Sequence, residues 1–175
     1  MEFETGDIIL TSKRSLIVRF MGWFQKDPCF WGHVLIAKDN ETAWEANWTL
    51  RESSIEEVLK KHKYYKILRK RDLTEKQKEI MRKVAPQLLG RFYGAGRIIL
   101  QLLDHVFCTD KFSGFDNNQY NQVCSSYGAW IYEMACRYKF NGVGWASCDP
   151  DDIEDDQLLY PATWKIRSEK GIRRK

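Results

Sequence analysis

The stretch NQVCSSYGAWIY, residues 121–132, has the pattern of a loop that turns into a helix with a cysteine, Cys124, in its first turn. A thiol at that position lies near the positive end of the helix dipole, which favours the thiolate, the nucleophilic form of cysteine. Most helix cysteines are small buried apolar residues, so Cys124 alone does not establish an active site. The apolar residues that follow recur at helical spacing and predict a buried face made of Tyr127, Trp130, Ile131 and Met134.

The length and composition of the chain favour one globular domain. Its 175 residues are 43% hydrophobic and 14% aromatic, which suits an ordered core rich in aromatic side chains. No internal repeat and no linker rich in Gly or Ser divides it. We therefore expect a single domain over residues 1–175, with a flexible basic tail at residues 167–175.

Targeting signals and cysteine usage indicate the compartment. No apolar run approaches the ~18 residues of a membrane-spanning helix, and residues 1–7 lack the apolar core of a signal peptide, so we expect a cytoplasmic protein. An odd number of scattered cysteines argues against a disulfide framework, and without a C-x-x-C pair we expect no zinc site, no other metal and no cofactor. The cysteines are Cys29, Cys108, Cys124, Cys136 and Cys148.

The formal net charge of +4 is unevenly distributed along the chain. Residues 60–97 hold thirteen Lys and Arg against three acidic residues, whereas residues 149–156 hold six acidic residues and no basic one. A basic segment can bind nucleic acid or anionic lipid, but a solvated helix face is the commoner reason for such a run. We therefore expect at most weak contact with anionic surfaces and no specific nucleic acid partner.

Two short apolar runs, residues 32–37 (GHVLIA) and 42–47 (TAWEAN), are separated by four residues with turn chemistry and predict a β-hairpin. A loop with an odd number of residues, centred on Asp39, would place His33 directly opposite Glu45 with both side chains on one face. A two-residue loop would turn Glu45 to the other face. The register of this hairpin therefore tests whether the two residues can act together.

The remaining elements predict an α+β fold, because strands cluster early in the sequence and helices cluster late. Capping boxes at 54–57 and 74–77 predict two helices, the second ending at Gly90 with a kink at Pro86. Further strands are expected at residues 6–10 and 64–69. Further helices are expected from Thr11 or Ser12 to Phe24, over residues 98–107, and over residues 151–157 after Pro150.

A cysteine hydrolase needs a thiolate, a base within hydrogen-bond reach and a third polar group that orients the base. The chain offers Cys124 at a helix start, His33 at the beginning of an apolar strand, and Glu45 in the next strand. Two other histidines compete for the role of base. His62 lies in a lysine run at a helix end, where we expect it to be exposed, and His105 falls in an expected helix as a core or cap residue.

Six short motifs follow one another along the chain, namely GDIIL at 6–10, GHVLI at 32–36, WEA at 44–46, LGRFY at 89–93, VCSS at 123–126 and CDPDDI at 148–153. Together they resemble the circularly permuted NlpC/P60 cysteine hydrolases, and most of all their YiiX-like branch. Two positions depart from the family pattern, since Ser126 stands where relatives often have Glu and Gly94 replaces an aspartate.

The resemblance implies a permuted papain-like fold, with a small antiparallel sheet or barrel packed against helices and the cysteine on a late helix. It implies that Cys124 is the nucleophile, His33 the general base and Glu45 the residue that orients the base. The activity it implies is hydrolysis of an amide bond, in a peptide or isopeptide-like substrate, or of a thioester, through a thioester intermediate. The backbone N–H of Cys124 would help to hold the oxyanion.

Two other functions remain open. Five aromatic residues in the segment 20–31, just before His33, and the basic residues 60–97 would suit a lipid-directed thioesterase or acyltransferase of the same fold at an anionic membrane. The second alternative is a non-enzymatic basic binding module, which predicts an unreactive Cys124 and salt-sensitive binding to a polyanion. The expected partner is therefore a peptide, an amide or an acyl-lipid substrate.

Overall fold

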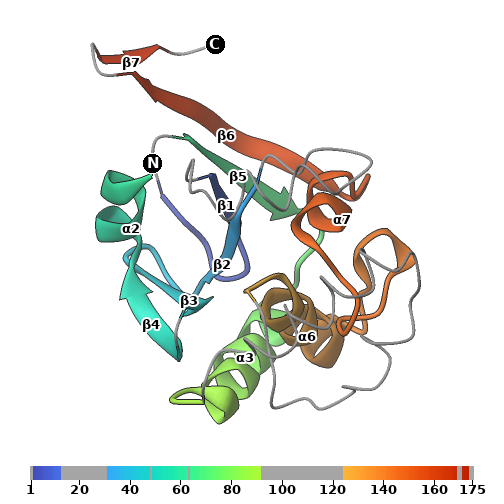
Figure 1. Ribbon diagram of the computed structural model, residues 1–175. Helices are drawn as coiled ribbons and strands as arrows, with labels where there is room; N and C mark the ends of the chain where they lie inside the picture. The colour runs from blue at the N-terminus through green and yellow to red at the C-terminus, as the bar shows by residue number, and fades with distance from the viewer. Residues whose placement is uncertain are drawn as a thin grey trace, which may run out of the picture.

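The computed structural model describes residues 2–12, 31–47, 49–62, 64–91, 124–168 and 171–173. They form a seven-stranded sheet in the order β4-β3-β2-β1-β5-β6-β7, with antiparallel neighbours throughout (Figure 1). The expected α+β class is confirmed. The strands are β1 Ile8–Ser12, β2 His33–Ala37, β3 Thr42–Ala46, β4 Leu50–Ser54, β5 Tyr64–Lys70, β6 Leu159–Ser168 and β7 Gly171–Arg173.

Helices cover both faces of the sheet. On one face, the apolar residues of β1 and β2 pack with α3 and α6, and on the other they pack with α2. Along β1 the side chains therefore alternate between two cores, since Ile8 and Leu10 join the larger core and Ile9 joins the smaller one. The described helices are α2 Ile55–Lys61, α3 Glu75–Val84, η1 Ala85–Leu88, α6 Cys124–Cys136, η2 Phe140–Gly142 and α7 Pro150–Glu154.

Helix α6 packs closely against β2. A Cβ atom placed on Gly128 would lie 3.2 Å from Ile36 Cδ1, so the glycine permits the short distance between helix and sheet. Three of the four residues of the predicted buried face are buried as expected. The prediction for the fourth, Met134, is wrong, because its side chain is 47% exposed and Ala135 provides the buried position in the last turn.

The capping signals in the sequence agree with the helix starts. Thr74 and Gln77 form the expected capping box of α3, and Pro150 is the first residue of α7, where the Asp149 carboxylate accepts backbone N–H groups. Helix α3 ends at Val84 rather than near Gly90, and Pro86 lies in the 3-10 turn η1 that follows it.

Three strands were not predicted from the sequence. β4 has the polar sequence LRESS, and β6 contains Pro161, so neither shows an apolar run. β6 extends to Ser168 and pairs with β7, which places strands within the segment expected to be a flexible tail. Thr11 and Ser12 belong to β1 rather than to a helix. The rest of the expected helix to Phe24, and that at 98–107, lie outside the described residues.

Candidate active site

The hairpin of β2 and β3 positions His33 and Glu45. The last pair of the hairpin is Ala37 with Ala43, so an odd number of residues, 38–42, lies between the paired positions. The side chains of His33 and Glu45 therefore share a face, as the first alternative required. The predicted register is wrong by two residues, because Glu45 pairs with Leu35 and His33 lies diagonally beside it. The reason is local. The Asp39 carboxylate accepts hydrogen bonds from the backbone N–H of Glu41 at 2.9 Å and of Thr42 at 2.7 Å, which moves the centre of the turn to residue 40.

Glu45 is a buried carboxylate with partners on both oxygens. Its side chain is 2% exposed, and its Oε2 lies 2.8 Å from His33 Nε2. Its Oε1 accepts hydrogen bonds from Arg51 Nε at 2.8 Å and from Ser53 Oγ at 2.6 Å. Burial by itself raises the pKa of Glu45, but hydrogen bonds from His33, Ser53 and Arg51 and the His33 charge outweigh it and lower the pKa to about 2.

The His33 ring connects Glu45 to Cys124. Burial lowers the pKa of His33, but hydrogen bonds and electrostatic attraction to Cys124 and Glu45 outweigh this effect and raise the pKa to about 9. Because Nε2 faces Glu45, we infer that Nδ1 faces the sulfur. The charged form of the His33 ring is therefore favoured near neutral pH.

Cys124 is the first residue of α6 and is 8% exposed. The two other described thiols have different surroundings, because burial raises the pKa of Cys136 to about 11 and raises that of Cys148 further. A raised pKa disfavours the thiolate, so these two cysteines are expected to be poor nucleophiles at neutral pH. Cys29 and Cys108 lie outside the described residues.

The three residues meet at the end of the sheet. Gly128 of α6 lies against Val34 and Ile36, whose side chains point away from the face that carries His33 and Glu45. His33 is the first residue of β2, so its ring can reach the first turn of α6 past the end of the strand. Segments more than 75 residues apart in the sequence thus contribute to one constellation.

Comparison with known proteins identifies the family. A family model described as permuted papain-like amidase enzyme, YaeF/YiiX, C92 family, matches residues 2–132. The chain belongs to the C92 family of permuted papain-like amidases. The predicted YiiX-like branch is thereby confirmed, and membership indicates a hydrolase that acts on amide bonds.

A solved structure supports the same fold. The crystal structure of metalloprotein yiiX from Escherichia coli O157:H7 matches with a TM-score of 0.68 and 15% sequence identity, over 92% of this chain and 97% of that chain. A comparison with curated protein sequences gave no match. Within the part of this C92 family chain that the structure describes, no three His, Cys, Asp or Glu side chains are grouped to hold one metal ion.

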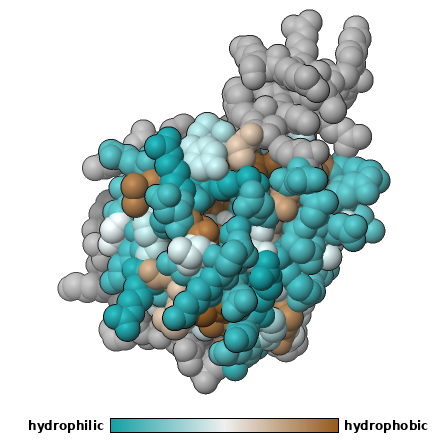
Figure 2. Space-filling view, turned by 180° about the vertical axis from the view of Figure 1, so that it is seen from behind, coloured by the Kyte–Doolittle hydropathy of each residue, from teal (hydrophilic) through white to brown (hydrophobic). Residues whose placement is uncertain are grey.

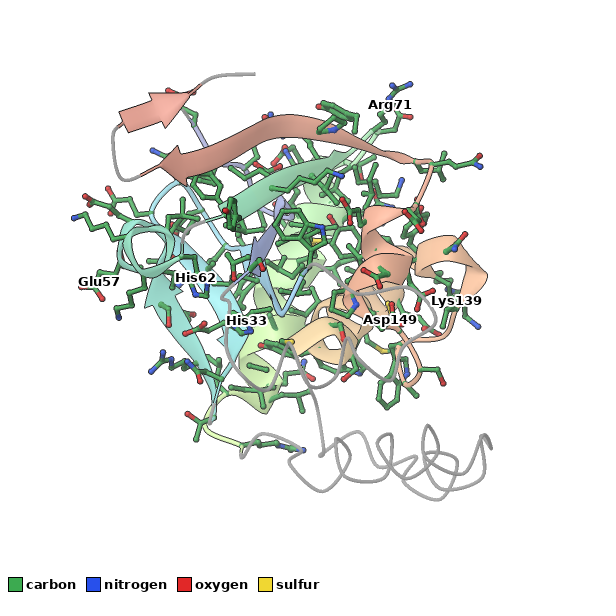
Figure 3. All side chains as sticks on the ribbon, turned by 45° about the horizontal axis from the view of Figure 1, so that its top comes forward. His33, Glu57, His62, Arg71, Lys139 and Asp149 are labelled. Atoms are coloured by element: carbon green, nitrogen blue, oxygen red, sulfur yellow. The ribbon has the colours of Figure 1, made fainter. Side chains whose placement is uncertain are left out.

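His62 corrects one expectation about the histidines. The expected exposed position is wrong, because His62 is half-buried and its ring is stacked on that of His33, with 6.5 Å between centroids and 15° between planes (Figure 3). His62 ends helix α2 as its C-cap, which brings the lysine-rich helix end next to the active site. The other competitor, His105, lies outside the described residues.

The sequence analysis also missed Arg51 and Ser53, the two β4 residues that bind Glu45. A signal was present, because continuing the hairpin into a third antiparallel strand would have placed the polar residues of LRESS beside Glu45. No strand was predicted over these residues, because they contain no apolar run.

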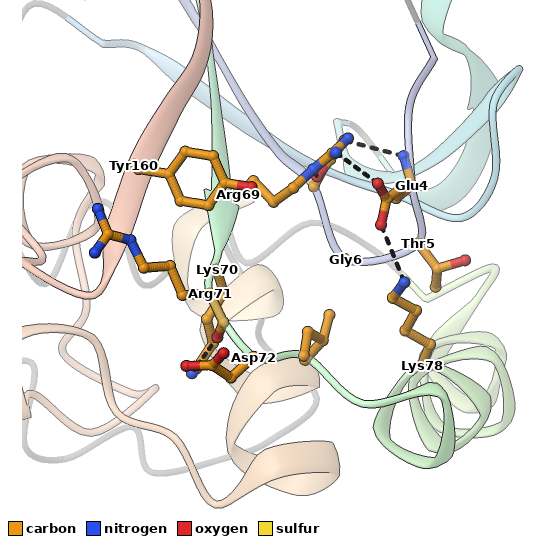
Figure 4. Close-up of a pocket in the computed structure, with 11 residues that line it drawn as sticks. Glu4, Thr5, Gly6, Arg69, Lys70, Arg71, Asp72, Lys78 and Tyr160 are labelled. Carbon is orange, nitrogen blue, oxygen red and sulfur yellow. Dashed lines mark hydrogen bonds and ion pairs between the residues drawn. The ribbon is translucent and has the colours of Figure 1, made fainter.

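A cavity of about 520 Å³ lies away from this site (Figure 4). The cavity is lined by Asp7, the residue just before β1. Asp7 lies four residues from Thr11, which pairs with His33, and this separation corresponds to about 13 Å along the strand. Its Arg69 and Lys78 side chains bind carboxylates of the cavity wall and of α3, so these two cations are already neutralised. The cavity therefore gives no reason to move the candidate active site.

Proposed function

We propose that this chain is a cysteine amidase in which Cys124 is the nucleophile, His33 the acid and base, and Glu45 the residue that orients His33. The observation that carries the proposal is the hydrogen-bonded series from Cys124 through His33 to a buried, ionised Glu45. A nucleophile, a base and an orienting group in contact are what covalent acyl transfer requires.

The reaction follows from the charges. The Cys124 thiolate attacks the carbonyl carbon of the amide, and a C–S bond forms. The His33 imidazolium donates its proton to the leaving nitrogen, the C–N bond breaks, and a thioester remains on the enzyme. Neutral His33 then takes a proton from water, whose oxygen attacks the thioester carbon. The C–S bond breaks, the carboxylic acid leaves, and the Cys124 thiolate and the His33 imidazolium are restored. The backbone N–H of Cys124, in the first turn of α6, would donate a hydrogen bond to the oxyanion.

The described surface gives little support to a lipid-directed enzyme. Among the described residues, the large exposed apolar side chains are Met134 and Leu158, and the face in Figure 2 is mainly hydrophilic with small separate hydrophobic areas. Trp31, one of the five aromatic residues considered for an apolar groove, is buried in the core, and its indole N–H donates to Glu154. The other four lie outside the described residues. None of the described helices is long and apolar enough to cross a bilayer.

The test is hydrolysis of a library of fluorogenic peptide amides by the wild-type chain and by Cys124→Ala. We expect turnover of some library members by the wild type and none by the variant, with equal melting temperatures. Cys136→Ala, at the opposite end of the same helix, is the matched control and should retain activity. Full activity in Cys124→Ala would refute the proposal. Salt-sensitive polyanion binding with no turnover would favour the binding module.

A further inference from the structure

Strand β4 supplies two polar side chains to the face that carries Glu45. Arg51 is paired with Glu45 directly across the strands, and Ser53 is paired with Ala43, one step further along the same face. Arg51 is therefore a direct neighbour of Glu45 across the strands, and Ser53 is a diagonal one. Their placement follows from the antiparallel register and does not depend on a loop.

The two oxygens of Glu45 have separate partners. Oε1 receives Arg51 Nε at 2.8 Å, Arg51 Nη2 at 2.7 Å and Ser53 Oγ at 2.6 Å. Oε2 has His33 Nε2 at 2.8 Å. Because three donors gather on one side of the carboxylate, they hold the plane of the group so that its other oxygen faces the imidazole of His33.

Because Glu45 is buried, its carboxylate depends on these contacts to remain ionised. A carboxylate that is 2% exposed is strongly disfavoured as an anion unless hydrogen bonds and positive charge replace water. His33 alone supplies one donor. The Arg51 guanidinium is half exposed, at 52%, and so can remain hydrated on one side while it neutralises Glu45 on the other.

We propose that Arg51 and Ser53 are positioning residues that hold Glu45 with one oxygen reserved for His33. The inference rests on the proposed function, because it concerns how the thiolate–imidazolium pair is maintained. Charges then alternate along a row that runs from Arg51 through Glu45 and His33 to Cys124, and each member stabilises its neighbour. Removing Arg51 therefore weakens the stabilisation of Cys124 through Glu45 and His33.

A second ion pair on β4 is a matched control. Glu52, on the opposite face of the strand, binds Lys38 Nζ at 2.7 Å, and the two side chains are 33% and 34% exposed. This pair joins the same part of the sheet but does not contact Glu45. Lys38→Gln therefore reports the cost of losing an ion pair from this sheet edge without disturbing the carboxylate.

The experiment measures the rate of Cys124 alkylation by iodoacetamide at pH 6, resolved by peptide mapping, so no substrate is needed. We expect Arg51→Gln to slow alkylation about tenfold and Ser53→Ala to slow it about threefold. Arg51→Lys should slow alkylation less than Arg51→Gln does, because lysine keeps the positive charge but lacks the forked guanidinium. Lys38→Gln should react at the wild-type rate. In a Glu45→Gln background, Arg51→Gln should have no further effect, since it acts through Glu45. Melting temperatures identify any variant that does not fold, and Ser53→Ala and Arg51→Lys then carry the test.

Two results would overturn the inference. One is an Arg51→Gln rate equal to that of Lys38→Gln, and the other is the same loss with and without Glu45. A failure of the proposed function looks different, because wild-type Cys124 would then be no more reactive than Cys136. As an independent readout, a ¹³C titration of the Glu45 carboxyl should show its pKa rise in Arg51→Gln.

Discussion

Two buried carboxylates in this molecule bind an arginine, and they use it differently. Asp7, at the start of β1, accepts Arg69 Nε on Oδ1 and Arg69 Nη2 on Oδ2, both at 2.7 Å, so the guanidinium occupies both oxygens. Glu45 gives one oxygen to Arg51 and keeps the other for His33. Both carboxylates are 2% exposed. The same pair of residue types therefore serves only structure at one end of the sheet and prepares a candidate catalytic base at the other.

The largest expected effect is on stability at the Asp7 site. Asp7→Asn leaves Arg69 without its main anionic partner, and breaking such a buried pair should lower the free energy of unfolding by about 3 kcal/mol. Urea denaturation measures this loss. Glu4→Gln, which removes a half-exposed partner of the same arginine, is the control and should cost less than about 1 kcal/mol. The comparison fails if Asp7→Asn changes Cys124 reactivity instead of stability.

The next largest effect is on activity at the Glu45 site. Glu45→Gln removes the anion that orients His33, and we expect kcat/KM on a responsive peptide amide to fall about 100-fold. Steady-state kinetics of the wild type, Glu45→Gln and Asp7→Asn measure the difference. An Asp7→Asn enzyme that loses as much activity as Glu45→Gln, while still folded, would remove the distinction between the two sites.

The pKa of His33 provides a further difference between the Glu45 site and the Asp7 site. Its value of about 9 arises because hydrogen bonds and electrostatic attraction to Cys124 and Glu45 outweigh the effect of burial. Removing either partner, by Glu45→Gln or Cys124→Ala, should lower the pKa of His33 by at least about one unit, whereas Asp7→Asn should leave it unchanged. An NMR titration of the His33 ring protons follows the shift. In the same way, kcat/KM of the wild type should decline as the pH rises through about 9, because the proton for the leaving group is lost.

The smallest expected effect is on stability, at a buried hydroxyl beside the candidate site. Thr11 pairs with His33 across β1 and β2, is fully buried, and its Oγ1 has no hydrogen-bond partner in the described part of the chain. Thr11→Val keeps the shape and removes the unsatisfied group, so it should stabilise the fold by about 1 kcal/mol. Thermal denaturation measures this gain. A loss of stability or of Cys124 reactivity would instead assign the hydroxyl a role beside His33.

Much of the candidate site could be predicted from local sequence. Cys124 at a helix start and His33 and Glu45 in adjacent strands are encoded in short motifs. The sequence left open whether His33 and Glu45 share a face, and the strand pairing in the structure shows that they do. The register was not predictable from strand pattern alone, because it depends on how the Asp39 side chain closes the turn. A two-residue error in register preserves the face and changes only the neighbour.

Arg51 and Ser53 were harder to predict, because the reason for their polarity, contact with the buried Glu45, depends on the fold. β4 contains Arg51 and Ser53 in order to bind a buried carboxylate, so it lacks the apolar alternation by which strands are recognised. His62 was assigned to the surface because of its lysine neighbours, but it ends α2 beside His33. Met134 was assigned to the core by spacing, although the last turn of α6 leaves that position open to solvent.

Competitive alkylation measures whether His33 activates Cys124. The wild-type protein would be treated with a limiting amount of iodoacetamide at pH 6, and modification at each of the five cysteines would be quantified by mass spectrometry. If His33 activates Cys124, the reagent should modify Cys124 selectively, and the His33→Ala variant should lose this selectivity. Uniform modification of the cysteines, or a Cys124 that reacts equally fast without His33, would contradict it.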